Sequence, residues 1–469
     1  MIEKNIRYDR QERIQNWDQS KLTKARAILI GGAQLTHFTA ASLAALGIGN
    51  IEVYIPQGEK TQGFLTPLGG EPRDLESKLR QMNPSSSIKV GTFDTELNLT
   101  QNRPDILLDL TNSPEMKDKS IGISSLYGIP IISASNGKTG GAFYLGTLGE
   151  IPASARLEDY AGSTQGGFSS EIMAGMITEE VRKSLMPLRE GEKPVKSLAY
   201  QGTAERRFAR EGDFEADPYE NISEKRILIV GAGALGNFTA LGAALEGIGN
   251  IDILDFDEVE AHNLNRQILF YDAVGRKKAE ALAAKVREIN PHAEVRSLVG
   301  KLDENTIYFE KNRPDVILDC VDNFATRALI NYFAVRYGIP LVSGGTNSQS
   351  GQVVVYEPGM SSCLQCKLDV EKTLALSLQG SKCTNSPDPS VIMTNEIVGG
   401  MMIGETLKVM DKGYGTPVSK ILKYDSNVPI RGGLIGAGDP CDCTRGDMKK
   451  WLTGVKERLE DISEASHGV

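Results

Sequence analysis

The sequence has only four histidines and six cysteines among 469 residues. So few histidines argue against a histidine-rich catalytic cluster. No apolar run approaches the roughly 18 residues that a membrane-spanning helix needs, and the first residues, MIEKNIRYDRQERIQ, are too charged for a secretory signal. We therefore expect a cytoplasmic protein that does not engage a membrane. In that compartment, metal binding or thiol chemistry explains six cysteines better than disulfides do.

An excess of positive charge is also missing. The net charge is −9, from 61 acidic and 52 basic residues, which argues against broad binding to nucleic-acid phosphates. Hydrophobic residues make up 40% and charged residues 24% of the chain, which is ordinary for a soluble protein. The length allows two or three domains, each with its own core.

The chain contains an internal repeat. The segment ILIGGAQLTHFTAASLAALGIGNIEVY at 28–54 is matched 200 positions later by LIVGAGALGNFTALGAALEGIGNIDIL. Further on, NRPDILLDL at 102–110 recurs as NRPDVILDC at 312–320, and EIMAGM at 171–176 recurs as EIVGGM at 396–401. The start of the chain also repeats, because RYDRQ at 7–11 is matched by RFARE 200 positions later. The repeat indicates two similar units in one chain.

Each unit alternates β-branched runs with helical patterns, which predicts α/β architecture with parallel strands covered by helices on both faces. We expect two tandem Rossmann-like, doubly wound domains that form an intramolecular pseudo-dimer. The predicted boundaries are 1–190 for the first domain, 191–222 for a linker and the entry segment of the second domain, 223–445 for the second domain and 446–469 for a C-terminal helix. That helix carries apolar residues on one stripe, so it either packs on the body or docks a partner.

The second unit carries a glycine-rich turn between a strand and a helix. Gly231, Gly233 and Gly236 form a full G-x-G-x-x-G, and Asp255 follows 19 residues after the last glycine. Glycine lets the backbone approach a phosphate, the helix N-terminus favours its charge, and the aspartate is placed to bind a ribose hydroxyl. The alternative is a tight turn without a ligand.

The first unit has lost these features. Ala33 and Thr36 replace the second and third glycines of the motif, and Ile55 stands where the second unit has Asp255. Gln57 likewise stands where the second unit has Asp257. The first unit is therefore expected to keep the fold without binding a nucleotide.

The glycine motif alone suggests a nicotinamide dehydrogenase, but the residues that follow it favour a triphosphate. Arg266 and Lys278 supply two cations, and Asp322 supplies a carboxylate at a strand end, where open α/β sheets bind ligands. This set suits ATP with Mg²⁺ better than a pyrophosphate bridge. The sequence has no G-x-x-x-x-G-K-[ST], so it is not a P-loop enzyme. Taken singly, each residue could be surface charge, and in the first unit Asn112 replaces Asp322.

The stretches GAGALG, DFDEVE, NLNRQ, VGRKK and DCVDN together resemble the adenylation domain of ubiquitin-activating enzymes and of their sulfur-carrier relatives in thiamin and molybdopterin synthesis. The resemblance covers about 207–443, and the first unit resembles the inactive adenylation domain of two-domain ubiquitin-activating enzymes. It implies that the chain binds ATP and Mg²⁺ and adenylates the C-terminal glycine of a ubiquitin-like protein. His262 departs from the family, which often has serine there.

The resemblance also implies roles for individual residues. In the family, the RYxRQ motif of one half sends an arginine into the ATP site of the other, which points to Arg10, with Arg7 nearby and with Arg210 facing the inactive site. Phosphate charge would be offset by Arg266, Lys278 and Arg10, and Mg²⁺ would be held by Asp322. The amide side chains of Asn263 and Gln267 would orient phosphate and ribose. The full predicted ATP site is Gly231, Gly233, Ala234, Gly236, Asp255, Asp257, Asn263, Arg266, Gln267, Lys278, Asp322 and Arg10.

Four of the six cysteines form two close pairs. Cys363 and Cys366 lie in CLQC, and Cys441 and Cys443 lie in PCDC. Four thiolates predict a closed tetrahedral zinc site of structural type, whereas four unrelated buried thiols are the alternative. The family resemblance implies a zinc site as well, although its usual spacing is C-x-x-C twice. A fifth cysteine, Cys320, lies within the apolar strand run VILDCVD and is expected to be buried.

The sixth cysteine, Cys383, lies in the polar segment GSKCTNSPDPS. From YGIP to the EI(M/V)xGM helix takes 41 residues in the first unit and 56 in the second, so this segment belongs to an insertion found only in the second unit. The segment resembles the crossover loop of the autophagy and ubiquitin-fold-modifier activating enzymes, whose cysteine carries a thioester. Because some sulfur-carrier adenylases transfer without such a cysteine, a non-catalytic role is the alternative.

Three functions follow as hypotheses. The first is an activating enzyme that adenylates a ubiquitin-like protein, takes it onto Cys383 and passes it to a conjugating enzyme. Such compact two-domain forms resemble enzymes of prokaryotic ubiquitin-like operons, some linked to phage defence. The second is a sulfur-carrier adenylyltransferase without a thioester step. The third, a non-enzymatic scaffold, is disfavoured by the intact NLNRQ and VDN stretches, and the fused inactive copy disfavours the second.

Overall fold

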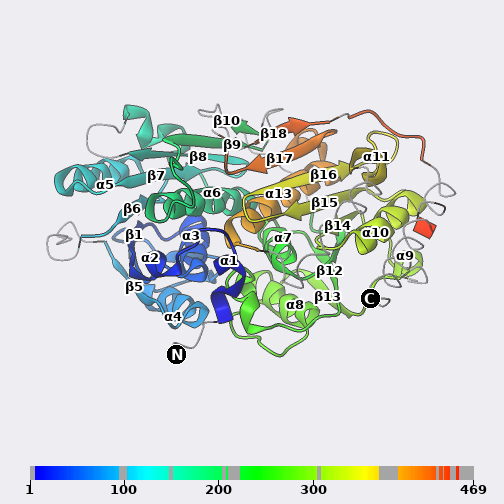
Figure 1. The fold of residues 1–469 in the computed structure, drawn as a ribbon, viewed down its shortest axis with the longest axis horizontal. Coiled ribbons are helices and arrows are strands. Elements are labelled where there is room, and N and C mark those ends of the chain that lie inside the picture. The colour runs from blue at the N-terminus through cyan, green and yellow to red at the C-terminus, as the bar shows by residue number, and fades with distance from the viewer. Residues whose placement is uncertain are drawn as a thin grey trace.

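The computed structural model describes residues 6–93, 103–146, 152–202, 207–209, 222–303, 308–368, 389–428, 432–436, 438–443, 450 and 452–453. Two α/β halves lie side by side, the first on the left and the second on the right of Figure 1. Each half is built on an eight-stranded sheet. The prediction of two tandem Rossmann-like units in one chain is confirmed.

The two sheets have the same strand order. In the first sheet the order is β5 (Ser87–Thr92), β2 (Asn50–Ile55), β1 (Arg26–Ile30), β6 (Ile106–Asp109), β7 (Ile131–Asn136), β8 (Gly140–Gly146), β9 (Ser197–Gln201) and β10 (Phe208–Ala209). In the second sheet it is β13 (Glu294–Val299), β12 (Asn250–Asp255), β11 (Arg226–Val230), β14 (Val316–Asp319), β15 (Leu341–Thr346), β16 (Ser350–Tyr356), β17 (Ile421–Asp425) and β18 (Gly432–Ile435). The sequence repeat is therefore a repeat of topology.

Five strands of each sheet run parallel, as predicted, but three more extend each sheet in antiparallel fashion. The extension was not predicted, because β8 and β16 follow their partners through a short turn rather than through a helix. Two of these strands, β9 and β10, lie within 191–222. That segment is therefore not simply a linker, since part of it completes the first sheet.

Helices cover the sheets and fill the space between the halves. The first half has α1 (Asp9–Glu12), α2 (Gln19–Lys24), α3 (Gln34–Leu46), α4 (Pro72–Met82), α5 (Pro114–Tyr127) and α6 (Gly167–Leu185). The second half has α7 (Ala234–Leu245), α8 (Lys278–Ile289), α9 (Tyr308–Lys311), α10 (Phe324–Tyr337), α11 (Leu364–Leu368) and α13 (Ile392–Met410). None of the helices in the described residues is both long and apolar enough to cross a membrane.

The halves meet through helices that are buried on every side. Helix α6 packs on α13 and α3, and α13 packs on α7, so that the four form the centre of the molecule in Figure 1. Almost every residue of α3, α6, α7 and α13 is buried, and one hydrophobic cluster runs through both halves. The charged residues buried in α6 and α13 include ion-paired side chains, such as Arg182 with Glu179 and Lys408 with Glu405. The largest hydrophobic cluster is therefore shared by the two halves, and further clusters lie within each half.

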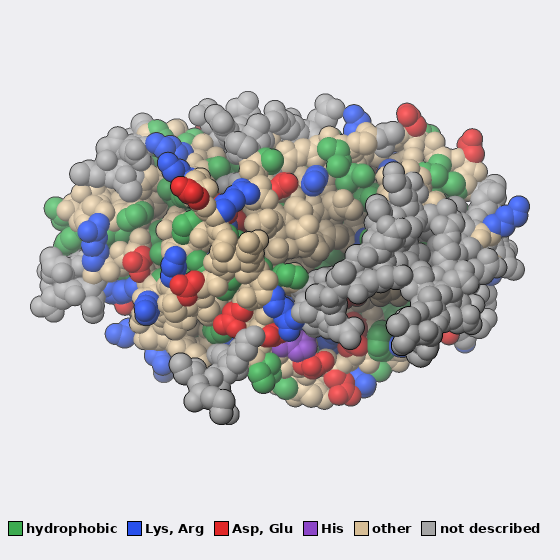
Figure 2. Space-filling view, in the orientation of Figure 1, with side chains coloured by type: hydrophobic (Ala, Val, Ile, Leu, Met, Phe, Trp, Pro, Cys, Tyr) green, Lys and Arg blue, Asp and Glu red, His purple; other side chains and the backbone are tan. Residues whose placement is uncertain are grey.

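The described surface carries charged side chains of both signs. On the face shown in Figure 2, acidic and basic side chains are interspersed over both halves, and the described part of that face shows no large patch of one sign.

Candidate functional site

The glycine turn of the second half leads from β11 into α7. Gly231 has a φ of +96°, a conformation that side chains disfavour, and a Cβ on Gly236 would lie 2.0 Å from the carbonyl oxygen of Gly231. Gly233 differs from both, because a Cβ built there would meet no atom within 4 Å. Gly231 and Gly236 thus shape the turn, whereas Gly233 leaves open space at the N-terminus of α7 that a phosphate could occupy.

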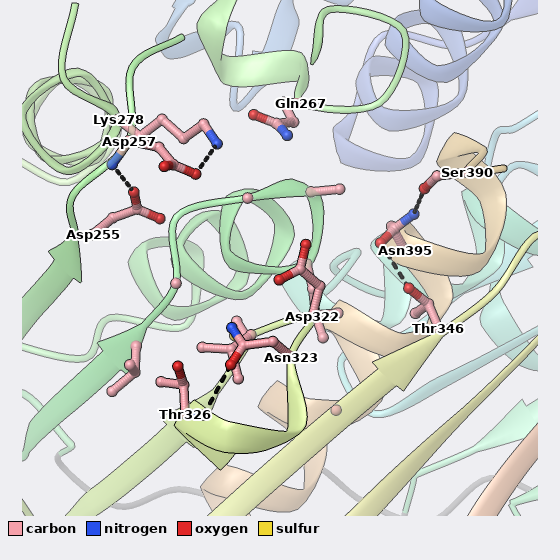
Figure 3. A pocket seen from close by; sticks show the side chains of 18 of the residues that line it. Asp255, Asp257, Gln267, Lys278, Asp322, Asn323, Thr326, Thr346, Ser390 and Asn395 are labelled. Carbon is pink, nitrogen blue, oxygen red and sulfur yellow. Dashed lines mark hydrogen bonds and ion pairs between the residues drawn. The ribbon is translucent and has the colours of Figure 1, made fainter. Parts of the chain in front are cut away.

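A cavity of about 1000 Å³ opens over this turn and is shown in Figure 3. Eleven of the twelve residues predicted to form the ATP site line it. They are Gly231, Gly233, Ala234, Asp255, Asp257, Asn263, Arg266, Gln267, Lys278, Asp322 and Arg10. Gly236 does not line the cavity; its part is the close packing of the helix on the turn.

Two cations of the second half enter the cavity. The Lys278 ammonium lies 3.0 Å from a carboxylate oxygen of Asp257, a pair visible in Figure 3. Arg266 is buried, and burial lowers its pKa to about 10, with a further lowering by Arg10 and an opposing effect of Asp322. Positive charges held together against their mutual repulsion indicate a site prepared for an anion.

Asp255 has a structural task beside the predicted one. One carboxylate oxygen accepts a hydrogen bond from the Ala232 amide at 2.6 Å, and the other accepts one from the Asp257 amide at 2.7 Å. The carboxylate therefore holds the glycine turn against the loop that follows β12. Each oxygen still has a second lone pair, so a ribose hydroxyl could also donate to it.

Two amide side chains follow in the NLNRQ stretch. Asn263 accepts a hydrogen bond from the Glu260 amide at 2.9 Å, so it shapes the short helix that carries it. Gln267 is only 3% exposed, and among the residues described its Oε1 has no hydrogen-bond donor. A buried acceptor without a donor is costly unless a ligand supplies one. Gln267 faces the cavity in Figure 3 and is therefore suited to a hydroxyl or a metal-bound water of the ligand.

The start of the chain docks on the same stretch of the second half. Arg7 donates to the carbonyl oxygen of Leu264 at 3.2 Å, and Asn265 donates to the Gln11 side chain at 3.1 Å. These contacts place Arg10, between them in sequence, at the cavity of the other half. The structure thus brings Arg10 to the site as expected, while Arg210 lies outside the described residues.

Asp322 and its neighbours stand at the carboxyl end of β14. Asn323 caps α10 by accepting the Thr326 amide at 2.9 Å, and this cap fixes the turn on which Asp322 sits. In Figure 3 the Asp322 carboxylate lies in the middle of the cavity. It could supply one oxygen to a magnesium ion, with phosphate oxygens and water supplying the others.

The far wall of the cavity was not predicted from the sequence. Thr346 ends β15 and donates to Asn395 Oδ1 at 3.1 Å, and the Asn395 amide reaches Ser390 at 3.3 Å and the Val391 carbonyl oxygen at 2.7 Å. These polar groups lie across the cavity from Lys278 in Figure 3. The signal available in the sequence was their position, since a strand end and a helix start meet at this edge of the sheet.

The matching place in the first half is filled by protein. The hairpin of β3 (Thr61–Gly63) and β4 (Thr66–Gly70) docks on the turn, with the Gln62 amide donating to Gly32 at 2.8 Å. From the other side, Gln165 accepts the Leu35 amide at the start of α3 at 2.8 Å. Asn112 spends its amide on two backbone carbonyl oxygens, at 2.7 and 2.9 Å. The helix N-terminus that would meet a phosphate is thus occupied.

The four paired cysteines come together at the end of the second half. Their sulfur atoms all lie within 4.8 Å of one another. The Cys363–Cys366 and Cys366–Cys443 sulfur separations are 3.9 and 3.4 Å, near the roughly 3.8 Å edge of a tetrahedron with zinc–sulfur bonds of about 2.3 Å. The donor set therefore fits zinc. Such a site would join the start of α11 to the segment at Cys441.

Two cysteines, His262 and the C-terminal segment remain to be placed. Cys320 is 7% exposed, as predicted, although it forms part of the cavity floor. His262 lines the cavity 3.3 Å from Glu260, and burial lowers its pKa, as do the charges of Arg10, Arg266 and Lys278. Cys383 lies outside the described residues, as does most of the predicted C-terminal helix, of which Leu452 is buried.

The sequence of the half that carries this site matches a known family. Residues 205–431 match the model of the ThiF family. The molybdopterin-synthase adenylyltransferase of Escherichia coli K12 is 34% identical over 217 residues, which cover 45% of this chain and 84% of that protein. The adenylyltransferase and sulfurtransferase MOCS3-1 of Zea mays is 32% identical over 236 residues, covering 50% of this chain and 49% of that one. The matched relatives are thus adenylyltransferases by name.

Among solved structures, E. coli MccB with succinimide aligns with a TM-score of 0.42 and 22% identity. The alignment covers 47% of this chain and 66% of that one. The same protein bound to ATP aligns with a TM-score of 0.41.

Proposed function

The chain belongs to the ThiF family, and on that basis we propose that its second half uses ATP to adenylate the C-terminal glycine of a ubiquitin-like protein. The single observation that carries the proposal is the cavity, in which Gly233, Arg266, Lys278 and Asp322 converge with Arg10 of the first half. Fixed positive charges, an open helix N-terminus and a central carboxylate suit a nucleoside triphosphate with a divalent cation.

The chemistry is a transfer of the adenylyl group. A terminal carboxylate oxygen attacks the α-phosphorus, the bond to the bridging oxygen breaks, and pyrophosphate leaves with that electron pair. Negative charge grows on the phosphate oxygens during this step, and we assign its stabilisation to Arg266, Lys278 and Arg10. The Lys278 ammonium would exchange Asp257 for phosphate. Magnesium, held in part by Asp322, would add charge neutralisation when bound.

We further propose that Cys383 accepts the acyl group as a thioester and passes it to a cysteine of a conjugating enzyme. The thiolate attacks the acyl carbon, and AMP leaves with the electrons of the broken carbon–oxygen bond. Pro389 and Ser390 line the cavity six and seven residues after Cys383, so the chain is long enough for the sulfur to reach it.

A second candidate is adenylation of a sulfur carrier without a thioester, as the names of the matched relatives suggest for those proteins. We also propose that zinc occupies the four-cysteine site and has a structural role, because four thiolates leave no position for water.

One experiment separates the two candidates. The protein is mixed with ATP and with ubiquitin-like proteins and sulfur carriers that end in glycine, and pyrophosphate exchange and non-reducing gels are run in parallel. Adenylation predicts exchange that disappears when the terminal glycine is deleted. A reductant-sensitive adduct that is lost in Cys383→Ala, with exchange retained, supports the thioester. Exchange without any adduct supports the sulfur-carrier candidate, and no exchange contradicts adenylation.

A further inference from the structure

A buried carboxyl group links the first half to the helix that begins at the cavity. In α13, Asn395 lines the cavity. The next residue, Glu396, is buried on the side of the helix that faces the first half. The Ser42 hydroxyl, on α3 of the first half, lies 2.9 and 2.8 Å from the two carboxyl oxygens of Glu396. Both residues are fully buried. The contact therefore joins two halves of the molecule just behind one wall of the site.

The two short contacts of this pair depend on the protonation state of Glu396. A hydroxyl has one hydrogen, so it can donate to only one of two nearby carboxyl oxygens. The second short contact is favourable when the carboxyl group is protonated and donates back to the serine oxygen. Burial raises the pKa of Glu396 well above its usual range, in agreement with this state. With Glu396 protonated, the pair forms a reciprocal hydrogen bond inside a closed interface.

The repeat supplies a natural comparison. Glu171 in α6 matches Glu396 within the repeated EI(M/V)xGM stretch, and Gly242 in α7 matches Ser42. Glu171 is also fully buried, but among the residues described neither of its carboxyl oxygens has a hydrogen-bond partner. A Cβ on Gly242 would lie 2.9 Å from one of them. The serine contact therefore exists only for the helix that begins at the open cavity, whereas α6 begins beside the filled one.

We propose that the Ser42–Glu396 hydrogen bond is a positioning contact for the site of adenylation, an inference that rests on the function proposed above. It fixes the first turns of α13 and thereby holds Asn395 against Thr346 and Ser390. This wall lies across the cavity from the glycine turn and Lys278 (Figure 3), so it faces the end left free by a bound nucleotide. The Asn395 amide already donates both of its hydrogens within the wall, to Ser390 and Val391. The groups left for the backbone of an extended peptide that ends in the reacting carboxylate are the second lone pair of Asn395 Oδ1 and the Ser390 and Thr346 hydroxyl groups.

The proposal predicts a selective effect on the protein substrate. Ser42→Ala and Glu396→Ala should raise the KM for a ubiquitin-like protein ending in glycine by about tenfold in pyrophosphate exchange, as loss of a buried hydrogen bond does. The KM for ATP should stay within about twofold of wild type. Glu396→Gln should retain most of the wild-type behaviour, because an amide can both donate to and accept from Ser42.

Glu171→Gln is the comparison variant, since it alters the same repeat position without a serine partner. Glu171 lies against α13 in the same interface, and burial and the Glu396 charge raise its pKa, so this variant tests whether any change of a buried carboxyl group there has the same effect. It should leave both KM values within about twofold of wild type. Exchange by the wild-type protein is measured first, so that failure of the proposed function is seen independently of the variants. Unchanged KM values in Ser42→Ala would overturn the inference. So would a parallel rise of both KM values with a lowered melting temperature in Ser42→Ala and Glu396→Gln alike, because that pattern describes general loosening of the interface.

Discussion

The two glycine turns of this molecule have the same fold around them and opposite contents. In the second half, the turn opens on a cavity lined by Arg266 and Lys278. In the first half, the turn is covered by a hairpin and by Gln165, which accepts a hydrogen bond from the Leu35 amide at the start of α3. The comparison teaches that a nucleotide site can be closed when other segments of the same half bond to the backbone of the turn and of the helix start, while the scaffold remains intact.

The filled half still serves the open one. Its first residues bring Arg10 to the opposite cavity, and its helix α3 supplies Ser42 to α13. If the first half has exchanged catalysis for support in this way, residues matched by the repeat should differ sharply in their effect on activity.

The largest difference is expected at the strand ends that carry Asp322 and Asn112. Asp322→Ala should lower pyrophosphate exchange by at least about 10³-fold, because it removes a carboxylate from the centre of the cavity. Asn112→Ala should leave the rate within about twofold, since its amide bonds only to the backbone of its own half among the residues described. A comparable loss from both changes would contradict the division of labour.

The next largest effect concerns the two arginines of the repeated N-terminal motif. Arg10→Ala should slow exchange by about 10²-fold, as removal of one charge-stabilising donor does. Arg210→Ala should have little effect, because it belongs to the copy predicted to face the filled site. Equal losses, measured as kcat/KM in the same assay, would show that the cross-half geometry does not decide the role of this position.

The four-cysteine site separates the halves by its effect on stability, because the first half has no cysteine and only the second half can bind zinc in this way. Purified protein should contain one zinc per chain by elemental analysis. Cys363→Ser should lose the metal and lower the melting temperature by several degrees, while ATP binding persists in the protein that remains folded. Cys320→Ser, a change outside the cluster, should keep full metal content. Protein that is free of zinc as purified would count against the assignment.

The smallest expected effect is on pH dependence. Burial raises the pKa of Glu246 to about 7, above the 4.5 of the unfolded chain, and its repeat partner Leu46 does not titrate. Between these values the folded state holds a proton that unfolding releases, so stability falls as pH rises through this window. Glu246→Gln should therefore show a smaller fall in melting temperature from pH 5 to pH 8 than wild type, and identical slopes would contradict this.

Much of this could be predicted from the sequence, for identifiable reasons. The parallel part of each sheet follows from apolar runs such as VILDC, and the glycine turn follows from spacing. The family assignment came from stretches that meet at one sheet edge. The antiparallel strands β8 and β16 were not foreseen, because alternation with helices ends before them.

The contacts by which the hairpin and Gln165 cover the first-half turn could not be predicted either. The sequence shows that Asn112 has replaced Asp322, but it does not show that Gln165 reaches the start of α3, because that contact joins residues 130 positions apart. The Ser42–Glu396 contact is hidden for the same reason, since it joins the two halves. The replacement of site residues can thus be predicted from the sequence, whereas the contacts that cover the first-half turn cannot.

The most direct test of one open and one filled site is the nucleotide stoichiometry, measured by equilibrium dialysis with radiolabelled ATP on wild type and Gly233→Val in parallel. The substituted side chain would enter open space, so the variant should fold and fill the phosphate position. We expect one ATP per wild-type chain and a large loss of binding in Gly233→Val. Two ATP molecules per chain, or undiminished binding by Gly233→Val, would contradict this division between the halves.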